Sequence, residues 1–301
     1  MPQWLLRCVK DLRRNFFGFL ASRGKIRYYP AMCLSDVIIV LSRPAEAGNV
    51  GAVCRAMKNM GLSRLRLSAP EFTNTTDAPA TLSEAGFAYG GTDAVIRARA
   101  VHGVDIWENA ERFDSLTAAV KDCALVIGTT QRRGSRRKQT MTPEEAAAFL
   151  KAHPGPAALV FGNERTGLET EEIDLCNFAS HIPASETFPS LNLSHAVMIY
   201  AYELFKALPL QPAKAVKGQL VPLDQEAMNN KVRELTDSLK TFGFYKQAGR
   251  EEQERFFRDI FSRAALTKKE VCYFNRIISK AALLESKTCP ETISNKGAED
   301  E

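Results

Sequence analysis

The feature that most constrains the fold is a repeated alternation of short apolar runs with amphipathic stretches. The run LSDVIIVL at Leu34–Leu41 is almost continuously apolar and rich in β-branched residues, as expected for a parallel strand buried on both faces. Asn49–Met60 follows with the spacing of a helix, and Gly61 is placed to end it. The alternation recurs as far as Leu208 with short connections. It therefore predicts an α/β fold, a parallel sheet with helices on both faces.

The other predicted elements of this α/β part follow in chain order. The predicted strands are Leu65–Ala69, Ala110–Phe113, Ala124–Gly128, Ala157–Phe161 and Phe178–Ile182. The predicted helices are Leu82–Tyr89, Asp93–His102, Asp114–Lys121, Pro143–Lys151, Glu169–Cys176 and Asn192–Leu208. Residues 71–103 fit the alternation least well, because they begin with a polar, turn-rich stretch.

A smaller region follows the α/β part. Pro209, Pro212 and Pro222 mark a linker between the two. Beyond it the pattern predicts three helices, at Leu223–Phe242, Arg250–Arg263 and Thr267–Leu284. Thr267 and Glu270 have the spacing of a capping box at the start of the third helix. The polar tail after residue 286 is predicted to be disordered.

The chain begins with a basic segment. Residues 1–31 hold seven Lys and Arg against one acid, Asp11, and their apolar residues recur at helical spacing. We interpret this segment as an extension ahead of Met32, with a transit peptide or a surface-binding helix as the alternatives. Arginines interrupt its apolar stretch, which argues against a secretory signal. The predicted division of the chain is an extension (1–33), an α/β domain (34–208), a linker (209–222), a helical C-terminal domain (223–286) and a tail (287–301).

Composition narrows the class of protein only a little. A net charge of +5 favours an anionic partner weakly, since many enzymes that act on small molecules are equally basic. The seven cysteines are scattered and form no C-x-x-C, which favours a reducing, cytoplasmic compartment and argues against a zinc site or a disulfide framework. The four histidines show no metal-ligand spacing. No apolar run approaches the ~20 residues needed to span a bilayer, so no membrane contact is expected.

Three separated segments place glycines and polar side chains where predicted strands end or helices begin. They are Gly48–Arg55 (GNVGAVCR), Leu159–Leu168 (LVFGNERTGL) and Pro189–Ser194 (PSLNLS). In an open α/β sheet, ligands bind at the carboxyl ends of the strands, where loops meet helix N-termini. Glycines allow tight turns and close approach of the backbone to a ligand, and a helix N-terminus attracts phosphate. We therefore expect the three segments to converge on one pocket.

The polar residues of these segments also have structural interpretations. Asn49 is placed to cap the helix that follows it, and either Ser190 or Asn192 is placed to cap the last helix of the α/β part. A strand–helix turn explains one glycine of the second segment, but it does not explain the Glu164 carboxylate between two glycines. Capping and a role in the site are compatible.

Arg55 lies on an otherwise apolar helix face, where we expect it to be buried and to need an anionic partner or a wet cleft. From the helix pattern alone, a salt bridge to Glu46 or Glu164 explains it equally well. The turn at Gly48 and Gly51 also suggests a dinucleotide-binding loop. It lacks the third glycine of G-x-G-x-x-G, which makes that interpretation the weaker one.

The order and spacing of the three segments resemble the three signature motifs of the SPOUT (trefoil-knot, TrmH-type) RNA ribose 2′-O-methyltransferases. Three motifs in order over one domain's length are far more specific than any one of them. The resemblance extends to TFGF at Thr241–Phe244 and RDIFSRAAL at Arg258–Leu266, so it covers about residues 34–285 and leaves 71–96 as an insertion. For the fold, it implies a deep trefoil knot, with the segment from about Ile182 to Leu208 threaded through the loop before it.

The resemblance also implies S-adenosylmethionine as the methyl donor and assigns residues to roles. The family's catalytic polar set corresponds to Arg55, Asn49, Glu164, Ser190 and Asn192. The cofactor is expected to contact Thr129, Thr130, Gln131, Gly162, Gly167, Ile182, Pro189, Ser190 and Leu191. We expect Arg55 to bind phosphate and to stabilise the developing oxyanion, because a guanidinium is not deprotonated in proteins.

A basic loop, QRRGSRRK at Gln131–Lys138, lies beside the expected cofactor edge. Charge runs are usually solvated loops, but this position favours RNA contact through Arg132, Arg133, Arg136, Arg137 and Lys138. The N-terminal arginines extend the same track. So do cations of the C-terminal region, at Lys231, Arg233, Arg250, Arg255 and Arg258.

The implied partner is tRNA or another structured RNA, with anticodon-loop position 32 as the leading target. Relatives that modify rRNA share the three motifs, so rRNA is the alternative substrate. A nucleotide-binding oxidoreductase and a catalytically silent RNA-binding module are the alternatives from other classes. The resemblance further implies a homodimer formed through the knot region. We expect one face of the last α/β helix to be core and dimer contact, through Leu193, Val197, Tyr200, Ala201 and Leu204.

Overall fold

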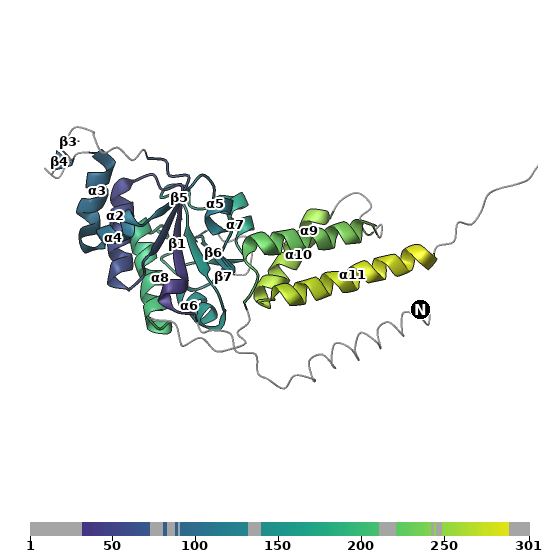
Figure 1. The fold of residues 1–301 in the computed structure, drawn as a ribbon. Coiled ribbons are helices and arrows are strands. Elements are labelled where there is room, and N and C mark those ends of the chain that lie inside the picture. Colours follow the sequence, from purple (N-terminus) through teal and green to yellow (C-terminus); the bar gives the residue numbers. More distant parts are fainter. Residues whose placement is uncertain are drawn as a thin grey trace, which may run out of the picture.

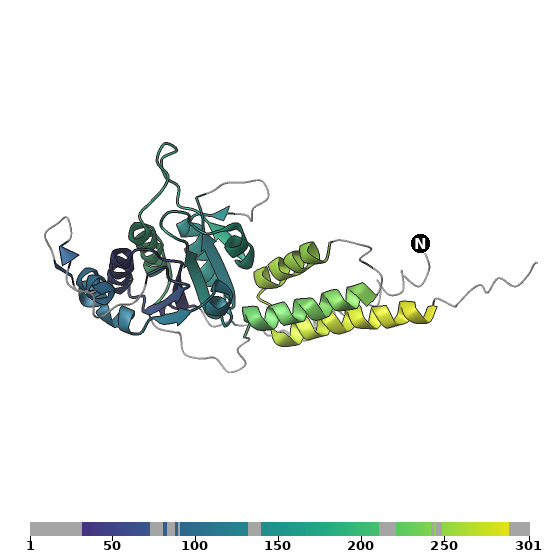
Figure 2. The same ribbon diagram turned by 90° about the horizontal axis from the view of Figure 1, so that it is seen from above.

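The computed structural model describes residues 32–72, 81–82, 88–89, 91–131, 140–210, 221–241, 244 and 249–288. The part of the chain before residue 210 forms a sheet with helices on both faces. Three further helices form a bundle beside it (Figures 1 and 2). This is the predicted α/β class with a helical C-terminal part.

Among the described residues, the main sheet has seven strands in the order β5-β2-β1-β8-β6-β9-β7, and every pairing in it is parallel. The strands are β1 (Val37–Ser42), β2 (Arg64–Ser68), β5 (Glu111–Phe113), β6 (Leu125–Thr129), β7 (Thr140–Met141), β8 (Ala157–Phe161) and β9 (Phe178–Ser180). Strands β1 and β8 are buried along their whole length. Strands β8, β6 and β9 are consecutive in this order and run parallel, so their carboxyl ends are neighbours.

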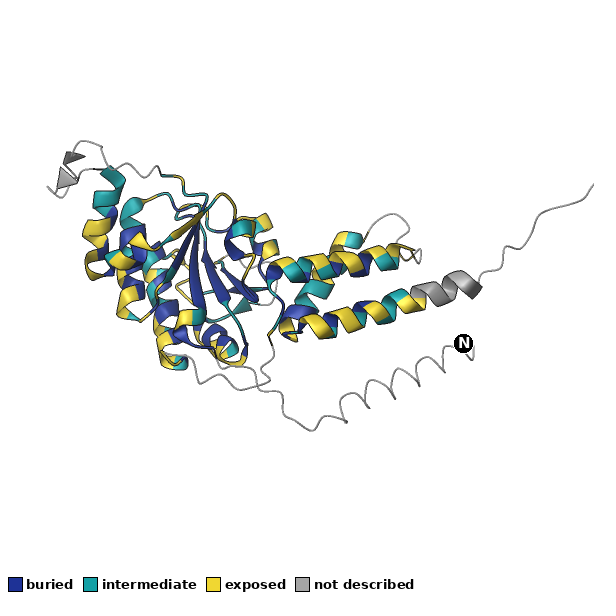
Figure 3. Cartoon of the chain, viewed as in Figure 1, coloured by how far each residue is buried: buried dark blue, intermediate teal, exposed yellow. Residues whose placement is uncertain are grey.

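The helices of the α/β part cover both faces of the sheet (Figure 3). They are α2 (Ala47–Asn59), α3 (Gly91–Ala100), α4 (Val104–Glu108), α5 (Leu116–Val120), α6 (Pro143–Ala152), α7 (Thr170–Leu175) and α8 (Leu193–Ala207). Successive residues of β1 point to opposite faces. Ile39 and Leu41 pack in the larger core with α2 and α8, whereas Ile38 and Val40 pack in a second core with α5 and α7.

Helix α8 carries the apolar face predicted for it. Its five expected core residues are all buried within the chain, and the helix contacts both α2 and α6. Burying each of its leucines or valines contributes roughly 1.5–3 kcal/mol. The core assignment is confirmed by this packing, while the trefoil knot predicted for the same segment stays a prediction.

The structure corrects the prediction in the insertion and at element ends. The prediction of a helix at Leu82–Tyr89 is wrong. Thr81–Leu82 (β3) and Ala88–Tyr89 (β4) instead pair as antiparallel strands. Gly86 and Gly90 lower the helix propensity of this stretch. Strand β7 and helix α4 were not predicted, because elements of two and five residues are too short to show a period.

The C-terminal bundle consists of α9 (Gln225–Thr241), α10 (Arg250–Arg263) and α11 (Lys268–Thr288) around a small core of its own. The predicted capping box is present: the Thr267 backbone N–H donates to Glu270 Oε2 (3.0 Å), and the Glu270 N–H donates to Thr267 Oγ1 (3.4 Å). The predicted linker lies largely outside the described residues, and the domain boundaries stay a prediction.

Buried polar contacts join the bundle to the amino ends of β6 and β9. Asn177, directly before β9, accepts from the Val126 N–H (2.8 Å) and from Gln225 Nε2 (2.8 Å), and it donates to Ser262 Oγ (2.8 Å). His153 Nε2 lies 3.1 Å from the Ser262 carbonyl oxygen. Burial lowers the pKa of His153 from its ordinary value, partly opposed by its contacts with backbone carbonyls. The bundle is therefore held by a hydrogen-bonded seam, which we call the docking seam (Asn177, Gln225, Ser262 and His153).

Candidate active site

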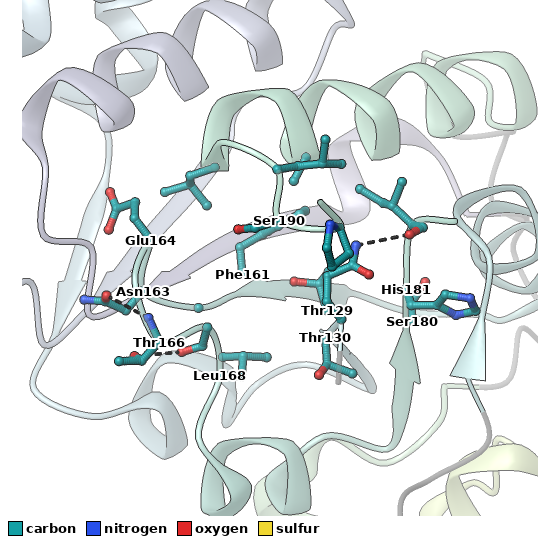
Figure 4. A pocket seen from close by; sticks show the side chains of 18 of the residues that line it. Thr129, Thr130, Phe161, Asn163, Glu164, Thr166, Leu168, Ser180, His181 and Ser190 are labelled. Atoms are coloured by element: carbon teal, nitrogen blue, oxygen red, sulfur yellow. Dashed lines mark hydrogen bonds between the residues drawn. The ribbon is translucent and has the colours of Figure 1, made fainter. Parts of the chain in front are cut away.

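A cavity of about 270 Å³ opens at the carboxyl ends of β8, β6 and β9. Its walls come from the loops after these strands and from the first turns of α8. In Figure 4 the side chains of Thr129, Phe161 and Ser190 lie in the middle of the pocket, with Asn163 and Glu164 on one side and His181 on the other. All nine residues predicted to contact the cofactor line this cavity: Thr129, Thr130, Gln131, Gly162, Gly167, Ile182, Pro189, Ser190 and Leu191.

Short hydrogen bonds fix the three strand ends relative to one another. The Thr130 N–H donates to the Ser180 carbonyl (2.9 Å), and Gln131 Nε2 donates to the Ile182 carbonyl (3.1 Å). Thr129 Oγ1 donates to the Val160 carbonyl (3.0 Å). These bonds tie the ends of β6, β8 and β9 into one rim, so the cavity is preformed by the sheet.

The inner wall of the pocket is rigid and mostly apolar. The Tyr200 hydroxyl, from α8, donates to Ser180 Oγ (2.7 Å), which in turn donates to the Met141 carbonyl (2.7 Å). The Tyr200 ring meets Phe161 edge-on, with centroids 5.5 Å apart. Burial raises the pKa of Tyr200, so its hydroxyl stays protonated and keeps this bond. Helix α8 is thereby anchored to the sheet directly behind the pocket.

Two glycines are required by the shape of the loop after β8. A Cβ at Gly162 would lie 2.1 Å from the backbone carbon of Gly167, so no side chain fits there. Gly167 has a φ of +68°, a conformation that other residues rarely adopt. Asn163 and Gly167 also form an isolated β-bridge across the loop. We call residues 162–168 the cofactor loop, after the ligand that the sequence predicts for this pocket.

A chain of hydrogen bonds links residues from all three predicted motifs. Asn49 Nδ2 donates to Glu164 Oε1 (3.1 Å), and Asn192 Nδ2 donates to Asn49 Oδ1 (2.9 Å). The Glu164 carboxylate also accepts from the backbone N–H groups of Ala45 (2.9 Å) and Glu46 (3.3 Å). The three segments therefore meet through side-chain contacts at the pocket edge that Glu164 lines, but no residue of Gly48–Arg55 lines the cavity itself.

Two capping predictions have different outcomes. Asn192 does cap α8, since its Oδ1 accepts from the Ser194 N–H (2.9 Å). Asn49 is not the N-cap of α2: it is the third helical residue, and Glu46 occupies the N-cap position. The reason is that the helix starts two residues earlier than predicted, which leaves the Asn49 amide free to bind Glu164 and Asn192.

Arg55 does not join this cluster within one chain. It lies six residues after Asn49 on α2, on a different face of the helix and about 9 Å further along its axis. Its side chain is exposed, so the expected burial is wrong, and it forms no ion pair with Glu46, Glu164 or any other described residue. Arg55 does not line the cavity. Its role in catalysis stays a prediction.

The basic residues predicted to bind RNA are placed only in part. Arg132, Arg133, Arg136, Arg137 and Lys138 lie outside the described residues. In the C-terminal bundle, three of the five predicted cations already have carboxylate partners: Lys231 with Glu234 (2.6 Å), Arg250 with Asp237 (2.7 Å) and Arg255 with Asp174 (3.2 Å).

Several residues of the pocket were not predicted from the sequence. His181, Leu193, Ala196 and Tyr200 line it beside the expected residues. His181 directly follows β9, so its position at the end of a strand was a usable signal. Its Nδ1 is buried and has no hydrogen-bond partner among the described residues.

The sequence model of the SpoU rRNA Methylase family matches residues 36–202, which is more than half of the chain. The chain belongs to this family.

Similar proteins agree with this assignment. The chain is 31% identical over 246 residues to an uncharacterized tRNA/rRNA methyltransferase of Haemophilus influenzae, with 80% of this chain and 92% of the relative covered. It is 32% identical over 252 residues to the tRNA (cytidine/uridine/adenosine-2′-O-)-methyltransferase TrmJ of Pseudomonas aeruginosa, covering 79% and 90%. The structure matches the crystal structure of TrmJ from Z. mobilis ZM4 with a TM-score of 0.62 and 28% identity, covering 81% of this chain and 98% of that one.

The family assignment confirms the resemblance inferred from the three motifs and decides against the dinucleotide-binding interpretation. The chain is an RNA methyltransferase of the SpoU type, an enzyme class that uses S-adenosylmethionine. In the part of the chain that the structure describes, no helix is long and apolar enough to cross a membrane.

Proposed function

We propose that this protein transfers a methyl group from S-adenosylmethionine to the ribose 2′-hydroxyl of a tRNA nucleotide, position 32 of the anticodon loop being the leading candidate. The observation that carries the proposal is the hydrogen-bonded chain Glu164–Asn49–Asn192, which joins the three motifs at the edge of the pocket. The relatives named TrmJ, which match along most of their length, support tRNA as the substrate.

The residues of the pocket fit S-adenosylmethionine. Apolar side chains such as Ile182, Leu191 and Leu193 offer a surface for a flat base, and the polar rim at Thr129–Gln131 offers hydrogen bonds for its edge. The buried Nδ1 of His181, for which the described residues provide no partner, is a further polar group that a ligand can satisfy. Bound there, the cofactor supplies an electrophilic methyl group on its sulfonium.

The polar chain orients the acceptor side of the pocket. Glu164 is held by two backbone N–H groups and by Asn49, so its carboxylate cannot turn away. Asn192 in turn fixes Asn49 and the start of α8, next to Ser190. Much of the rate of an in-line displacement comes from such alignment of the reacting groups.

Arg55 contributes from outside the pocket of its own chain. Its exposed guanidinium, which pairs with no carboxylate in the described part of the chain, can fork onto a phosphate and the acceptor hydroxyl. This lowers the energy of the developing oxyanion while the proton leaves to phosphate or water. The Arg55→Lys variant keeps the charge and loses the fork. We expect kcat to fall by about 10²-fold or more, as for loss of an oxyanion donor, with unchanged affinity for S-adenosylmethionine by calorimetry. Near-normal kcat would remove Arg55 from this role.

We propose that the protein acts as a homodimer formed through α8 and the segment around it. Tyr202 and Phe205 are 49% and 46% exposed on the outer side of this helix, and Leu210 just beyond it is 61% exposed. Such an apolar surface on a single chain is typical of an interface. Light scattering of the full chain tests this directly: a monomer at micromolar concentration would contradict the dimer.

We infer from its charge that helix α11 is the part of the C-terminal bundle that contacts RNA. Helices α9 and α10 each hold equal numbers of acidic and basic residues, whereas residues 268–281 of α11 hold four basic residues and one acid, Glu270, which caps Thr267. No ion pair forms between these four cations and any described carboxylate. Lys269, Tyr273, Arg276 and Lys280 recur at helical spacing, and the Arg276 guanidinium lies 5.1 Å from the Tyr273 ring.

Two lysines in the first turn of α11 strengthen this interpretation. Cations at a helix N-terminus oppose the helix dipole, so Lys268 and Lys269 lower the stability of the helix they begin. Residues that break a local rule in this way are typical of functional surfaces. A row of cations with one aromatic ring suits a phosphate backbone with a neighbouring base.

The proposal is tested by incubating the protein with labelled methyl donor and unmodified tRNA or rRNA transcripts. We expect label in tRNA, as a 2′-O-methyl nucleoside. Label in rRNA alone would favour the alternative substrate of the family. Binding of RNA without any transfer would indicate a silent RNA-binding module. We place this activity in the cytoplasm, in agreement with the free cysteines of the described residues.

A further inference from the structure

Arg43 contacts the cofactor loop from outside the pocket and belongs to none of the three motifs. It directly follows β1 and does not line the cavity. Its guanidinium Nη2 donates to the Gly167 carbonyl (3.2 Å), and its Nη1 pairs with Glu169 (2.9 Å). The backbone carbonyl of Arg43 accepts from Asn163 Nδ2 (2.7 Å). One residue therefore holds both ends of the loop that begins at Gly162 and ends at Leu168.

The anchor of this arrangement is Glu172 on α7. Its carboxylate accepts from Arg43 Nε (3.3 Å) and Nη2 (2.8 Å), from Ser42 Oγ and from the Glu169 N–H (2.7 Å). The Glu172 side chain is only 12% exposed, so the ion pair is well shielded from water. Hydrogen bonds from Arg43 and Ser42 outweigh burial and lower the pKa of Glu172, which stays ionised at neutral pH.

The backbone of Arg43 adopts a conformation that arginine seldom takes. Its φ is +50°, in the left-handed region that favours glycine. Such strain persists only where the surroundings determine the conformation, and it is concentrated at functional sites. Here the strained backbone points the Arg43 carbonyl at Asn163. The side chain of Asn163 in turn accepts from the Arg165 N–H (2.9 Å) inside the loop.

We infer that Arg43 is a positioning residue for cofactor binding. By holding the Gly167 carbonyl, the Arg43–Glu172 pair turns one face of the cofactor loop outward and presents the other face to the pocket. The loop is then preorganised, and the cofactor does not have to order it on binding. Losing the pair should weaken S-adenosylmethionine binding and leave the chemical step intact at saturating cofactor. The inference rests on the proposed use of this pocket for the methyl donor.

A second arginine provides a matched control. Arg66 on the neighbouring strand β2 also joins strand, helix and carboxylates, through Glu111 (2.9 Å), the Ala119 carbonyl (2.7 Å) and Asp122 (2.8 Å). Its side chain is 5% exposed, and none of these partners lines the cavity. If Arg43 acted only by stabilising the fold, substitutions at Arg43 and Arg66 should have the same kind of effect.

The experiment compares Arg43→Gln, Arg43→Lys and Arg66→Gln in the full chain at a temperature where each is folded. Calorimetry measures the Kd for S-adenosylmethionine without RNA, and steady-state assays measure KM and kcat. We expect Arg43→Gln to raise Kd and KM for the cofactor about 10–50-fold with kcat within 3-fold. Arg43→Lys should restore part of the affinity, and Arg66→Gln should lower Tm without changing Kd.

Glu172→Gln keeps the inference testable if Arg43→Gln does not fold, because it breaks the same pair from the other side. We expect it to raise Kd as much as Arg43→Gln, and the double variant to be no worse than either single one. An unchanged Kd in the folded variants, or an equal rise in Arg66→Gln, would overturn the role of Arg43 and leave the proposed function standing. A wild-type chain that binds no S-adenosylmethionine would overturn both.

Discussion

Asn177 and His181 flank strand β9, only four residues apart, and their side chains differ in how far their polar atoms are hydrogen-bonded. At its amino end, Asn177 is 5% exposed, and both the oxygen and the nitrogen of its side chain are hydrogen-bonded, to the sheet and to the C-terminal bundle. At its carboxyl end, Ser180 and His181 line the cavity. Ser180 Oγ is hydrogen-bonded to Tyr200 and Met141, whereas the buried Nδ1 of His181 has no partner among the residues that the structure describes. The polar contacts of Asn177 hold the bundle to the sheet, whereas His181, in the wall of the proposed cofactor pocket, keeps one nitrogen that no described residue satisfies. We therefore expect substitutions on the Asn177 side to lower stability and substitutions on the pocket side to lower activity.

The largest expected effect is on the pocket side, at Glu164 in the loop after β8. Glu164→Gln replaces an acceptor with an amide whose N–H₂ faces the donors of Ala45, Glu46 or Asn49. We expect kcat/KM to fall by about 10–100-fold, since positioning groups contribute on this scale, while the free energy of unfolding changes little. Steady-state kinetics and chemical denaturation measure the two quantities. Glu171→Gln, an exposed carboxylate on α7, is the control and should leave both unchanged.

At Asn177 we expect the reverse: a loss of stability with little change in cofactor binding. Asn177→Ala leaves the Val126 N–H, Gln225 and Ser262 without their buried partner, which should lower the free energy of unfolding by about 2–4 kcal/mol. KM for S-adenosylmethionine should stay within 2-fold in the folded fraction. A variant of normal stability with impaired cofactor binding would reverse the comparison and show that the seam serves the pocket instead.

Acid should weaken the docking seam through His153. Burial lowers its pKa, so the folded chain disfavours the charged imidazolium that the unfolded chain accepts. The contribution of His153 is fully present above its ordinary pKa of about 6.5 and is lost as pH falls towards the lower folded value. Stability measured from pH 7.5 to 5 should decline, and His153→Gln should flatten this decline. An identical slope in the variant would exclude His153 as the group that titrates.

The smallest expected effect is on tRNA binding, and it compares cations of the C-terminal bundle that have ion-pair partners with cations that have none among the described residues. Lys231, Arg250 and Arg255 of α9 and α10 pair with carboxylates, whereas the four cations in residues 268–281 of α11 pair with none among the described residues. Changing Lys269, Arg276 and Lys280 to Gln should reduce the slope of log K against log salt for tRNA binding by about 2, since each phosphate contact contributes roughly 0.7–0.9.

A triple variant at Lys121, Lys151 and Lys240, three exposed lysines that are far apart in the sequence, carries the same change in net charge. It should keep the wild-type slope. Equal slopes in the two triple variants would mean that net charge alone attracts the RNA, and that α11 is no specific contact.

Much of the fold was predictable because its elements are long and strongly patterned. The limits of Ala157–Phe161 and Arg250–Arg263 agree with the prediction, since a fully apolar run and a long amphipathic run leave little choice of period. Strand β7 is held in the sheet by its pairing with β9 and has no local signal of its own. The insertion was misjudged for a related reason, because its short strands pair with each other and lack a helical or strand-like period.

The residues of the site that belong to sequence motifs could be predicted. The residues that reach the site only through tertiary contacts could not. Glycines and polar residues at strand ends led to the cavity. The position of Arg55 outside that cavity could not be predicted, because the helix pattern gives its face and not what covers that face. Arg43 gave no signal either: its contacts with Gly167 and Glu172 span more than 120 residues of sequence and exist only in the folded chain.

The central claim is that this pocket delivers a methyl group to one ribose hydroxyl of tRNA. It is tested most directly with two otherwise identical tRNAs, one of which carries a 2′-deoxyribose at nucleotide 32. We expect one methyl group per unmodified tRNA, mapped to that ribose by mass spectrometry, and none on the deoxy substrate. Equal transfer to both tRNAs, or a methyl group on a base, would contradict it.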